Sequence, residues 1–227
     1  MPIVDSLRAV WADLAAAATA AGRDPGSVRL VAVSKTHPIE RVREAFEAGQ
    51  LVFGENRVQE LHEKQPLLPQ AQWHLIGHLQ TNKVKYIAPY VALIHSVDSE
   101  KLLAEIDSRA AQQGRVIPVL LQVNISDEGQ KSGLPPEAVA PLLQQASRYP
   151  SVRVAGLMGL AELTDDTVRI RGQFRTLAQL RQTLAAHDFG PTVALTELSM
   201  GMSGDYRIAI EEGATLVRIG SAIFGAR

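Results

Sequence analysis

The stretch Val28-Arg29-Leu30-Val31-Ala32-Val33-Ser34-Lys35 (residues 28–35) decides the fold. Its first seven residues are almost wholly apolar and rich in β-branched side chains, which is typical of a parallel strand buried on both faces. A lysine follows where this strand ends. The sequence therefore predicts a parallel sheet covered by helices, with an amine at the carboxyl end of the first strand.

Short apolar segments of the same kind recur along the chain and alternate with helical patterns. We expect eight strands, at residues 28–34, 51–56, 73–79, 91–98, 116–125, 152–160, 195–203 and 215–224. Helical spacing separates most of them, at 39–48, 57–67, 81–87, 139–146, 174–178 and after residue 204. Eight strands alternating with helices in fewer than 250 residues predict an α/β fold, a single (β/α)₈ TIM barrel.

One helix precedes the first strand, and nothing divides the chain. Leu7, Val10 and Leu14 recur at helical spacing, so an extra N-terminal helix should end near Gly22. No repeat, linker or shift in composition is found, and we expect residues 1–227 to form one domain. A doubly wound sheet that binds dinucleotides would need a glycine-rich turn after its first strand, and residues 34–38 contain no glycine.

Composition and charge narrow the class of protein. The 227 residues are 46% hydrophobic, with 23 basic against 24 acidic side chains, which is typical of a soluble globular protein and predicts no nucleic-acid partner. The absence of cysteine excludes disulfides, thiolate catalysis and zinc sites built on cysteine. No run of eighteen apolar residues and no convincing signal peptide is found, so we expect a cytoplasmic protein without a membrane partner.

Active sites of such barrels gather where the strands end. Burial of Lys35 there would favour the neutral amine that reacts with carbonyl compounds, although a lysine whose head reaches solvent fits the position equally well. Ser203 and the pair Gly220-Ser221 follow strands seven and eight, where barrels of this type bind phosphate. Helix capping by Ser203 and a turn at Gly201 are the plainer alternatives.

Other polar residues at the strand ends have structural and functional interpretations. Arg218 lies in an apolar strand and only donates hydrogen bonds, so it needs an acceptor, either a carboxylate such as Glu197 or a ligand atom. Asn56 ends the second strand, where it can cap the next helix. Asn124 ends the fifth strand and needs backbone or ligand partners. A polar loop that contains Lys131-Ser132-Gly133 follows it.

His74 and His78 are the one pair with a spacing that would suit a metal ion. Four residues apart, they share one side of a strand. No third ligand is in reach, so ordinary hydrogen-bonded histidines are favoured, and we expect no metal.

Taken together, these blocks give the chain a resemblance to a known family. It resembles the pyridoxal phosphate homeostasis protein family, whose barrel is that of the alanine racemase N-terminal domain, PLP fold type III. The resemblance spans nearly the whole chain and rests on residues 32–35, 53–56, 74–83, 131–133, 156–158, 198–203 and 217–225.

The resemblance implies a cofactor and a role for each site residue. Lys35 would hold pyridoxal 5′-phosphate (PLP) as an internal aldimine, and Arg218 would face the pyridine nitrogen. Phosphate binding would fall to Ser203, Gly220 and Ser221, and we add Asn56 to the cofactor-binding set. Because arginine only donates, the ring nitrogen would stay unprotonated, which disfavours carbanion chemistry.

Three functions remain open, and we favour a non-catalytic carrier. It would be a monomer that maintains PLP homeostasis by buffering the cofactor and supplying it to apo-enzymes. The alternative is a PLP-dependent amino-acid racemase, which needs a base on each face of the substrate. In the related racemase a tyrosine from an additional domain is the second base, and here only Tyr206 lies near a strand end. A class I aldolase that binds a sugar phosphate on Lys35 is the third, and a yellow colour of the purified protein would exclude it.

Two positions depart from the pattern of the family. Gly204 replaces an acidic residue, and Arg207 stands where a glutamate is common. We expect both to lie on the helix after strand seven, where they leave the surface charge and the partner contacts open.

Overall fold

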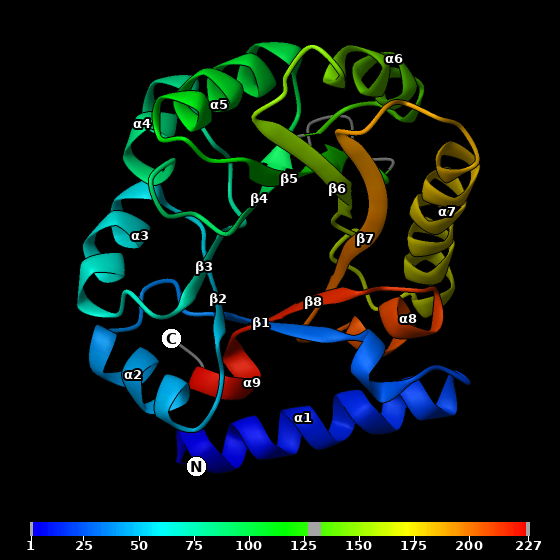
Figure 1. Ribbon diagram of the computed structural model, residues 1–227. Helices are drawn as coiled ribbons and strands as arrows, with labels where there is room; N and C mark the ends of the chain where they lie inside the picture. Colours follow the sequence, from blue (N-terminus) through cyan, green and yellow to red (C-terminus); the bar gives the residue numbers. More distant parts are fainter. Residues whose placement is uncertain (1, 127–132, 226–227) are drawn as a thin grey trace.

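A computed structural model of the protein, which describes residues 2–126 and 133–225, contains eight parallel strands closed into a barrel. Figure 1 shows the barrel with its ring of helices. Each strand pairs with the next in sequence, and the first pairs with the last, which confirms the predicted (β/α)₈ barrel. The strands are β1 (Arg29–Val33), β2 (Val52–Glu55), β3 (Gln72–Leu75), β4 (Leu93–Val97), β5 (Ile117–Val123), β6 (Val152–Gly159), β7 (Val193–Met202) and β8 (Leu216–Ile219).

Helices connect the strands and form the outer layer. They are α1 (Ile3–Ala20), α2 (Ile39–Glu47), α3 (Val58–Lys64), α4 (Val84–Ile87), α5 (Glu100–Gln112), α6 (Pro136–Ala146), α7 (Thr167–Ala185), α8 (Tyr206–Glu211) and α9 (Ser221–Phe224). Three short 3₁₀ turns occur at η1 (Pro25–Ser27), η2 (Gln65–Leu67) and η3 (Thr81–Lys83).

The predicted N-terminal helix is present as α1. Its apolar residues Leu7, Val10 and Leu14 are buried on one face, which packs against α2, α8 and α9. The helix ends where Gly22 takes a φ of 69°, a conformation that glycine adopts at little cost. α1 therefore covers the outside of the barrel where the first and last strands meet (Figure 1).

The last predicted strand is too long, and this difference shapes the candidate site. The prediction extended it to Phe224, whereas β8 ends at Ile219 and residues 221–224 form α9. The main-chain N–H groups of Ile223 and Phe224 both donate to the carbonyl of Gly220, which closes a helical turn. An apolar run of this length does not distinguish a strand from a helix, so sequence reasoning continued the strand.

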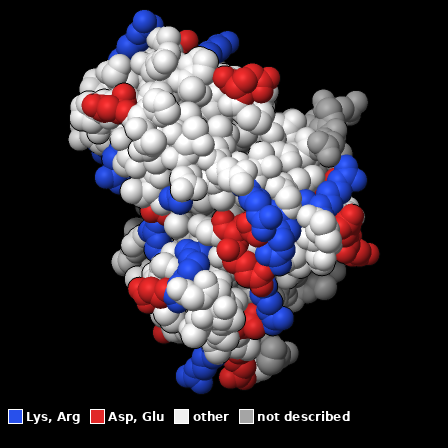
Figure 2. All heavy atoms as spheres, turned by 90° about the vertical axis from the view of Figure 1, so that its right-hand side faces the viewer, with Lys and Arg blue, Asp and Glu red and all other residues white. Residues whose placement is uncertain are grey.

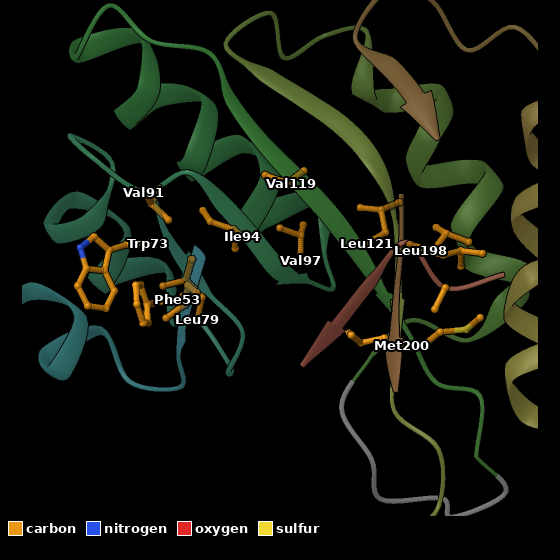
Figure 3. Packing of buried hydrophobic residues seen from close by; sticks show 14 of the residues in the cluster. Phe53, Trp73, Leu79, Val91, Ile94, Val97, Val119, Leu121, Leu198 and Met200 are labelled. Carbon is orange, nitrogen blue, oxygen red and sulfur yellow. The ribbon is translucent and has the colours of Figure 1, made fainter. Parts of the chain in front are cut away.

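The core has two layers because successive strand residues point to opposite sides. The larger layer lies between strands and helices, where Phe53, Trp73 and Ile94 pack together with other buried side chains (Figure 3). A smaller cluster that includes Val31, Leu120 and other apolar residues fills the barrel interior. Val31 pairs with Arg218 across β1 and β8, so the arginine also points inward.

The helical surface carries both signs of charge side by side. Figure 2 shows basic and acidic side chains interleaved on the face that includes α7 and α8. Arg171 and Arg175 of α7 pair there with Glu212, which follows α8. Within residues 2–126 and 133–225, no helix is both long and apolar enough to cross a bilayer.

Candidate functional site

A cavity of about 540 Å³ opens where the barrel strands end. This volume falls in the range of about 300–1,000 Å³ that small-molecule sites occupy. All six residues that the sequence predicts for cofactor binding line it: Lys35, Asn56, Ser203, Arg218, Gly220 and Ser221. The rest of the lining comes from Val33, His37, Ile76, Leu160, Leu163, Met202, Gly204 and Gly225.

Lys35 reaches the cavity from the turn that follows β1. The turn begins with Ser34, which is fully buried and whose N–H donates to the carbonyl of Gly54 over 3.1 Å. The N–H of His37 donates back to the carbonyl of Ser34 over 3.1 Å. Lys35 is half-buried between these fixed points and lines the cavity.

Arg218 reaches the cavity from inside the barrel. It is 4% exposed, and its guanidinium donates to the hydroxyl of Ser199 and, over 3.0 Å, to the carbonyl of Gly159. Burial lowers the pKa of Arg218 to about 10, although the charge of Asp205 partly offsets this effect. The guanidinium therefore stays charged at neutral pH.

The carboxylate that sequence reasoning offered to Arg218 lies elsewhere. Glu197 accepts hydrogen bonds from Arg29 over 2.5 Å and from the hydroxyl of Thr215 over 2.6 Å. The prediction of a Glu197–Arg218 pair is therefore wrong. Glu197 lies before the bulge between β7 and β8, and its partners Arg29 and Thr215 stand at the beginning of β1 and just before β8, away from the strand ends that line the cavity.

A line of neutral side chains continues from Arg218 across the barrel. The hydroxyl of Ser199 lies 2.9 Å from Nδ1 of His95, and Nε2 of His95 lies 3.0 Å from Nδ1 of His74. We refer to Arg218, Ser199, His95 and His74 as the Arg218 chain. Burial lowers the pKa of His74 to about 3 and that of His95 well below its usual value, so both rings are neutral near pH 7.

This arrangement changes the interpretation of the histidines. His74 bonds to His95 of the next strand and not to His78, which is exposed. Within the described ranges, no cluster of three or more histidine, aspartate or glutamate side chains could hold a metal ion. Sequence reasoning missed His95, although a histidine inside the apolar strand 93–97 is the same kind of signal that drew attention to Asn124.

Ser203, Gly220 and Ser221 gather on the side of the cavity formed after β7 and β8. Ser203 does not cap α8, whose first turn is preceded by Asp205, so the capping alternative is wrong. Gly201 lies within β7, where the pairing with β8 shifts register, so the alternative of a turn there is wrong; its φ of 93° and the 2.6 Å that would separate a Cβ from Ala209 explain why it is a glycine.

Gly220 shows why a small residue stands beside the cavity. A Cβ there would lie 3.0 Å from the carbonyl oxygen of Val33, so a side chain would press on β1. The first N–H groups of any helix have no acceptor within it, and those of α9 start here. Together with two hydroxyls, these N–H groups form a set of donors suited to an anion.

Asn56 lines the cavity from the turn after β2, and its predicted capping role is wrong. Arg57 occupies the N-cap position of α3, with no side-chain hydrogen bond to the helix. The main chain at Asn56 is instead packed against Gly77, where a Cβ would approach the Asn56 carbonyl oxygen to 2.3 Å. Asn56 is thereby held half-buried at the cavity.

Other residues that the sequence singled out lie away from the cavity. Asn124 accepts hydrogen bonds from the N–H and hydroxyl of Ser126, and it lines a separate cavity of about 690 Å³. Lys131 and Ser132 lie outside the described residues. Tyr206 bonds to Asp13 of α1 and does not line the candidate site.

The two departures from the family pattern have simple surroundings. Arg207 donates two hydrogen bonds to Asp13, at 2.6 and 3.0 Å, and so ties α8 to α1. Gly204 lies in the turn before α8 and not on the helix as expected; it lines the cavity, and a Cβ there would meet no atom within 4 Å. The arginine therefore has a structural partner, whereas nothing in the backbone requires glycine at position 204.

The closed barrel, with a lysine after its first strand and hydroxyl and N–H donors after its last, belongs to the class of alanine-racemase-like barrels. The family model described as "Alanine racemase, N-terminal domain" matches residues 6–227. The solved alanine racemase of Streptomyces lavendulae has the same fold, with a TM-score of 0.74, 21% identity, and coverage of 99% of this chain and 58% of that chain.

Closer relatives narrow the class further. The pyridoxal phosphate homeostasis protein of Aquifex aeolicus is 44% identical over 91% of this chain and 90% of its own length. That of Pseudomonas aeruginosa is 43% identical over 99% and 96%. The structure of PipY from Synechococcus elongatus with PLP bound has 39% identity and a TM-score of 0.82, and covers 93% of this chain and 100% of that chain. The chain therefore belongs to the alanine racemase N-terminal domain family and, within it, to the pyridoxal phosphate homeostasis proteins.

Proposed function

We propose that this protein binds PLP in the cavity at the barrel mouth and serves as a carrier that maintains PLP homeostasis. One observation carries the proposal: a lysine, a charged arginine and a set of anion donors line one cavity. The names of the relatives and the PLP bound to PipY support the same cofactor.

Lys35 would form the covalent bond. PLP supplies an aldehyde when it is bound, and a neutral lysine amine condenses with such a group. The nitrogen of Lys35 bonds to the aldehyde carbon and gives up its two protons, and the aldehyde oxygen leaves with them as water. The position of Lys35 in the cavity wall fits this role.

Arg218 and the donors after β7 and β8 would hold the other two ends of the cofactor. The guanidinium can donate a hydrogen bond to the ring nitrogen, and its partners Ser199 and Gly159 fix it for that contact. Ser203, Gly220 and Ser221 would hold the phosphate. Because Arg218 stays charged at neutral pH, it would not accept a proton from the ring nitrogen and would leave it unprotonated.

The cavity favours a carrier over a racemase. Within the described residues, its lining contains no tyrosine and no carboxylate, and Tyr206 is bonded to Asp13 outside it. Its two titratable groups besides Arg218 are Lys35 and His37, which both follow β1. A racemase needs an acid or base on each face of its substrate. We therefore expect purified protein to show no turnover of alanine or serine above background, and robust turnover that Lys35→Ala abolishes would establish the racemase instead.

We further propose that the protein is a cytoplasmic monomer that passes PLP to apo-enzymes. The carrier role needs a site that binds a reactive aldehyde reversibly, and an imine is reversible in water. The test is to mix loaded protein with an apo-enzyme that requires PLP and to follow the recovery of its activity, with free PLP scavenged. A rate no faster than that of the scavenged control would contradict transfer.

The experiment that tests PLP binding is an absorbance spectrum of the purified protein before and after borohydride reduction. Reduction should remove the visible band, and mass spectrometry of the peptides should find the cofactor mass on Lys35. A modification on any other lysine would contradict the assignment.

A further inference from the structure

A buried cluster of charged side chains lies directly behind Lys35 and takes no part in lining the cavity. Glu55 at the end of β2 is fully buried, and Lys64 at the end of α3 is 8% exposed. The ammonium of Lys64 donates to Oε1 of Glu55 over 2.7 Å and lies 3.5 Å from Oε2 of Glu60. Removing charged groups from water costs free energy unless they are paired. The Lys64–Glu55 pair with Glu60 beside it therefore needs a structural or functional reason.

The cluster holds both neighbours of Lys35 in the chain. On one side, the ammonium of Lys64 donates to the carbonyl of Ser34 over 2.8 Å, and the Ser34 hydroxyl donates to Glu55 over 2.7 Å. On the other side, the N–H of Thr36 donates to Oε2 of Glu60 over 2.7 Å. The residue between these two anchors is Lys35.

The backbone of this turn needs such anchors. Thr36 has a φ of 65°, in the left-handed region that β-branched residues rarely adopt. A conformation of this kind persists only where surrounding contacts hold it, and the bond to Glu60 is the contact made by the Thr36 N–H itself. If the turn relaxed, the direction in which the Lys35 side chain leaves the backbone would change.

We propose that Glu55, Glu60 and Lys64, hereafter the clamp, are positioning residues that hold Lys35 in the orientation that reacts with the cofactor aldehyde. The inference rests on the proposed function, in which Lys35 forms the covalent bond. The clamp acts through the backbone of Ser34 and Thr36.

Glu60 offers the sharpest test, because its side chain is 22% exposed and its truncation leaves the core filled. Glu60→Ala removes the acceptor for Thr36, whereas Glu60→Gln keeps an oxygen acceptor without the charge. Glu63→Ala is a matched control, because Glu63 is exposed on the same helix. Each variant is titrated with PLP and with pyridoxal, which has the aldehyde but no phosphate, and imine formation is followed by absorbance.

We expect Glu60→Ala to weaken imine formation roughly tenfold with both aldehydes, the size of one charge-assisted hydrogen bond. Glu60→Gln should recover most of this loss, and Glu63→Ala should match the unchanged protein. Hydrogen exchange at the Thr36 amide should also be faster in Glu60→Ala. Glu60→Ser, which leaves a short polar side chain, should repeat the result.

The clamp is overturned if folded Glu60→Ala and Glu60→Ser bind both aldehydes as the unchanged protein does. It is also overturned if the loss appears with PLP alone, because that would place the effect at the phosphate. Lys35→Ala separates this inference from the proposed function. A visible band that survives Lys35→Ala refutes the covalent role of Lys35, whereas a band lost there and unaffected by Glu60→Ala refutes the clamp alone.

Discussion

Two groups of buried polar side chains support residues that line the cavity, the clamp at Lys35 and the Arg218 chain, and they hold their charges in different ways. In the clamp behind Lys35, an ammonium contacts two carboxylates. In the Arg218 chain, the guanidinium contacts a hydroxyl and a carbonyl, and the two histidines beyond it are neutral near pH 7. The first group pairs its positive charge internally, with one carboxylate in excess, and the second places a positive charge at the cavity.

The difference indicates that the clamp and the Arg218 chain have different roles. A charge that is already paired has little left to offer a ligand, so the clamp can fix the backbone without competing for the cofactor. Its own lysine, Lys64, is held by Glu55 and Glu60 and does not line the cavity, so it is not placed to react with the cofactor aldehyde. Arg218, held by neutral partners, keeps its attraction for an acceptor atom of a ligand.

The largest expected effect comes from removing the amine of Lys35, the proposed reactive group. Lys35→Ala should abolish the visible imine band, because no other lysine lines the cavity in the described part of the chain. Absorbance titration with PLP measures it. Lys85→Ala, at an exposed lysine of α4, should leave the band unchanged. Retention of the band at full stoichiometry in Lys35→Ala would show that another amine carries the cofactor.

The next effect tests whether Arg218 offers its charge to the ligand. Arg218→Gln should raise the dissociation constant of PLP about ten- to a hundredfold, because it removes a charge-assisted hydrogen bond of about 1.5–3 kcal/mol. Arg29→Gln is the control, since Arg29 is a half-exposed arginine at the other end of the same strand pair. An unchanged dissociation constant in a folded Arg218→Gln variant would make Arg218 a structural residue.

The pH dependence of stability should show whether the buried histidines of the Arg218 chain are neutral. Burial lowers the pKa of His74 to about 3, with a further contribution from the charge of Arg29, so between about pH 6.5 and 3 the unfolded state binds a proton that the folded state does not. Stability from this group is therefore lost as the pH falls, by about 1.4 kcal/mol per pH unit well below 6.5. Urea unfolding at pH 7, 6 and 5 measures it, and His74→Gln should make the pH dependence shallower. Equal slopes for both proteins would mean that His74 is protonated in the fold.

The smallest effect concerns the support of Arg218. Ser199→Ala removes one of the two acceptors that hold the guanidinium and leaves the carbonyl of Gly159. We expect the dissociation constant of PLP to rise roughly two- to tenfold, the range of one hydrogen bond. Ser199→Thr, which keeps a hydroxyl, is the matched variant and should bind more tightly than Ser199→Ala. A loss as large as that of Arg218→Gln would show that Ser199 controls the whole position of the arginine.

Much of the fold could be predicted because its pattern is local. Buried parallel strands appear as short apolar runs, and several of them end in a polar residue at the barrel mouth. This pattern is enough to indicate Lys35, Arg218 and Ser203 as residues of the barrel mouth. The predicted end of the last strand at Phe224 was wrong, because the apolar residues 222–224 are compatible with a strand or with a helix. In the structure, hydrogen bonds to the carbonyl of Gly220 close a helical turn there.

The contacts behind the site could not be predicted, because they join residues far apart in the chain. Ser199 and His95 are 104 positions apart, and Lys64 reaches Ser34 across 30 positions. Nothing local shows that Glu197 faces Arg29 or that Asn56 leaves the cap of α3 to Arg57. Such pairings follow from strand register and from the direction of each side chain, which a single sequence leaves open.

The pairing of β1 with β8 has a consequence for how the protein is made. Lys35 leaves the ribosome early, whereas Arg218 and Ser221 emerge only after almost all of the described chain has been synthesised. During synthesis, Lys35 is therefore present long before Arg218 and Ser221, the residues that would hold the other ends of the cofactor. A complete binding site for PLP therefore forms only after β8 has been synthesised and has paired with β1 to close the barrel.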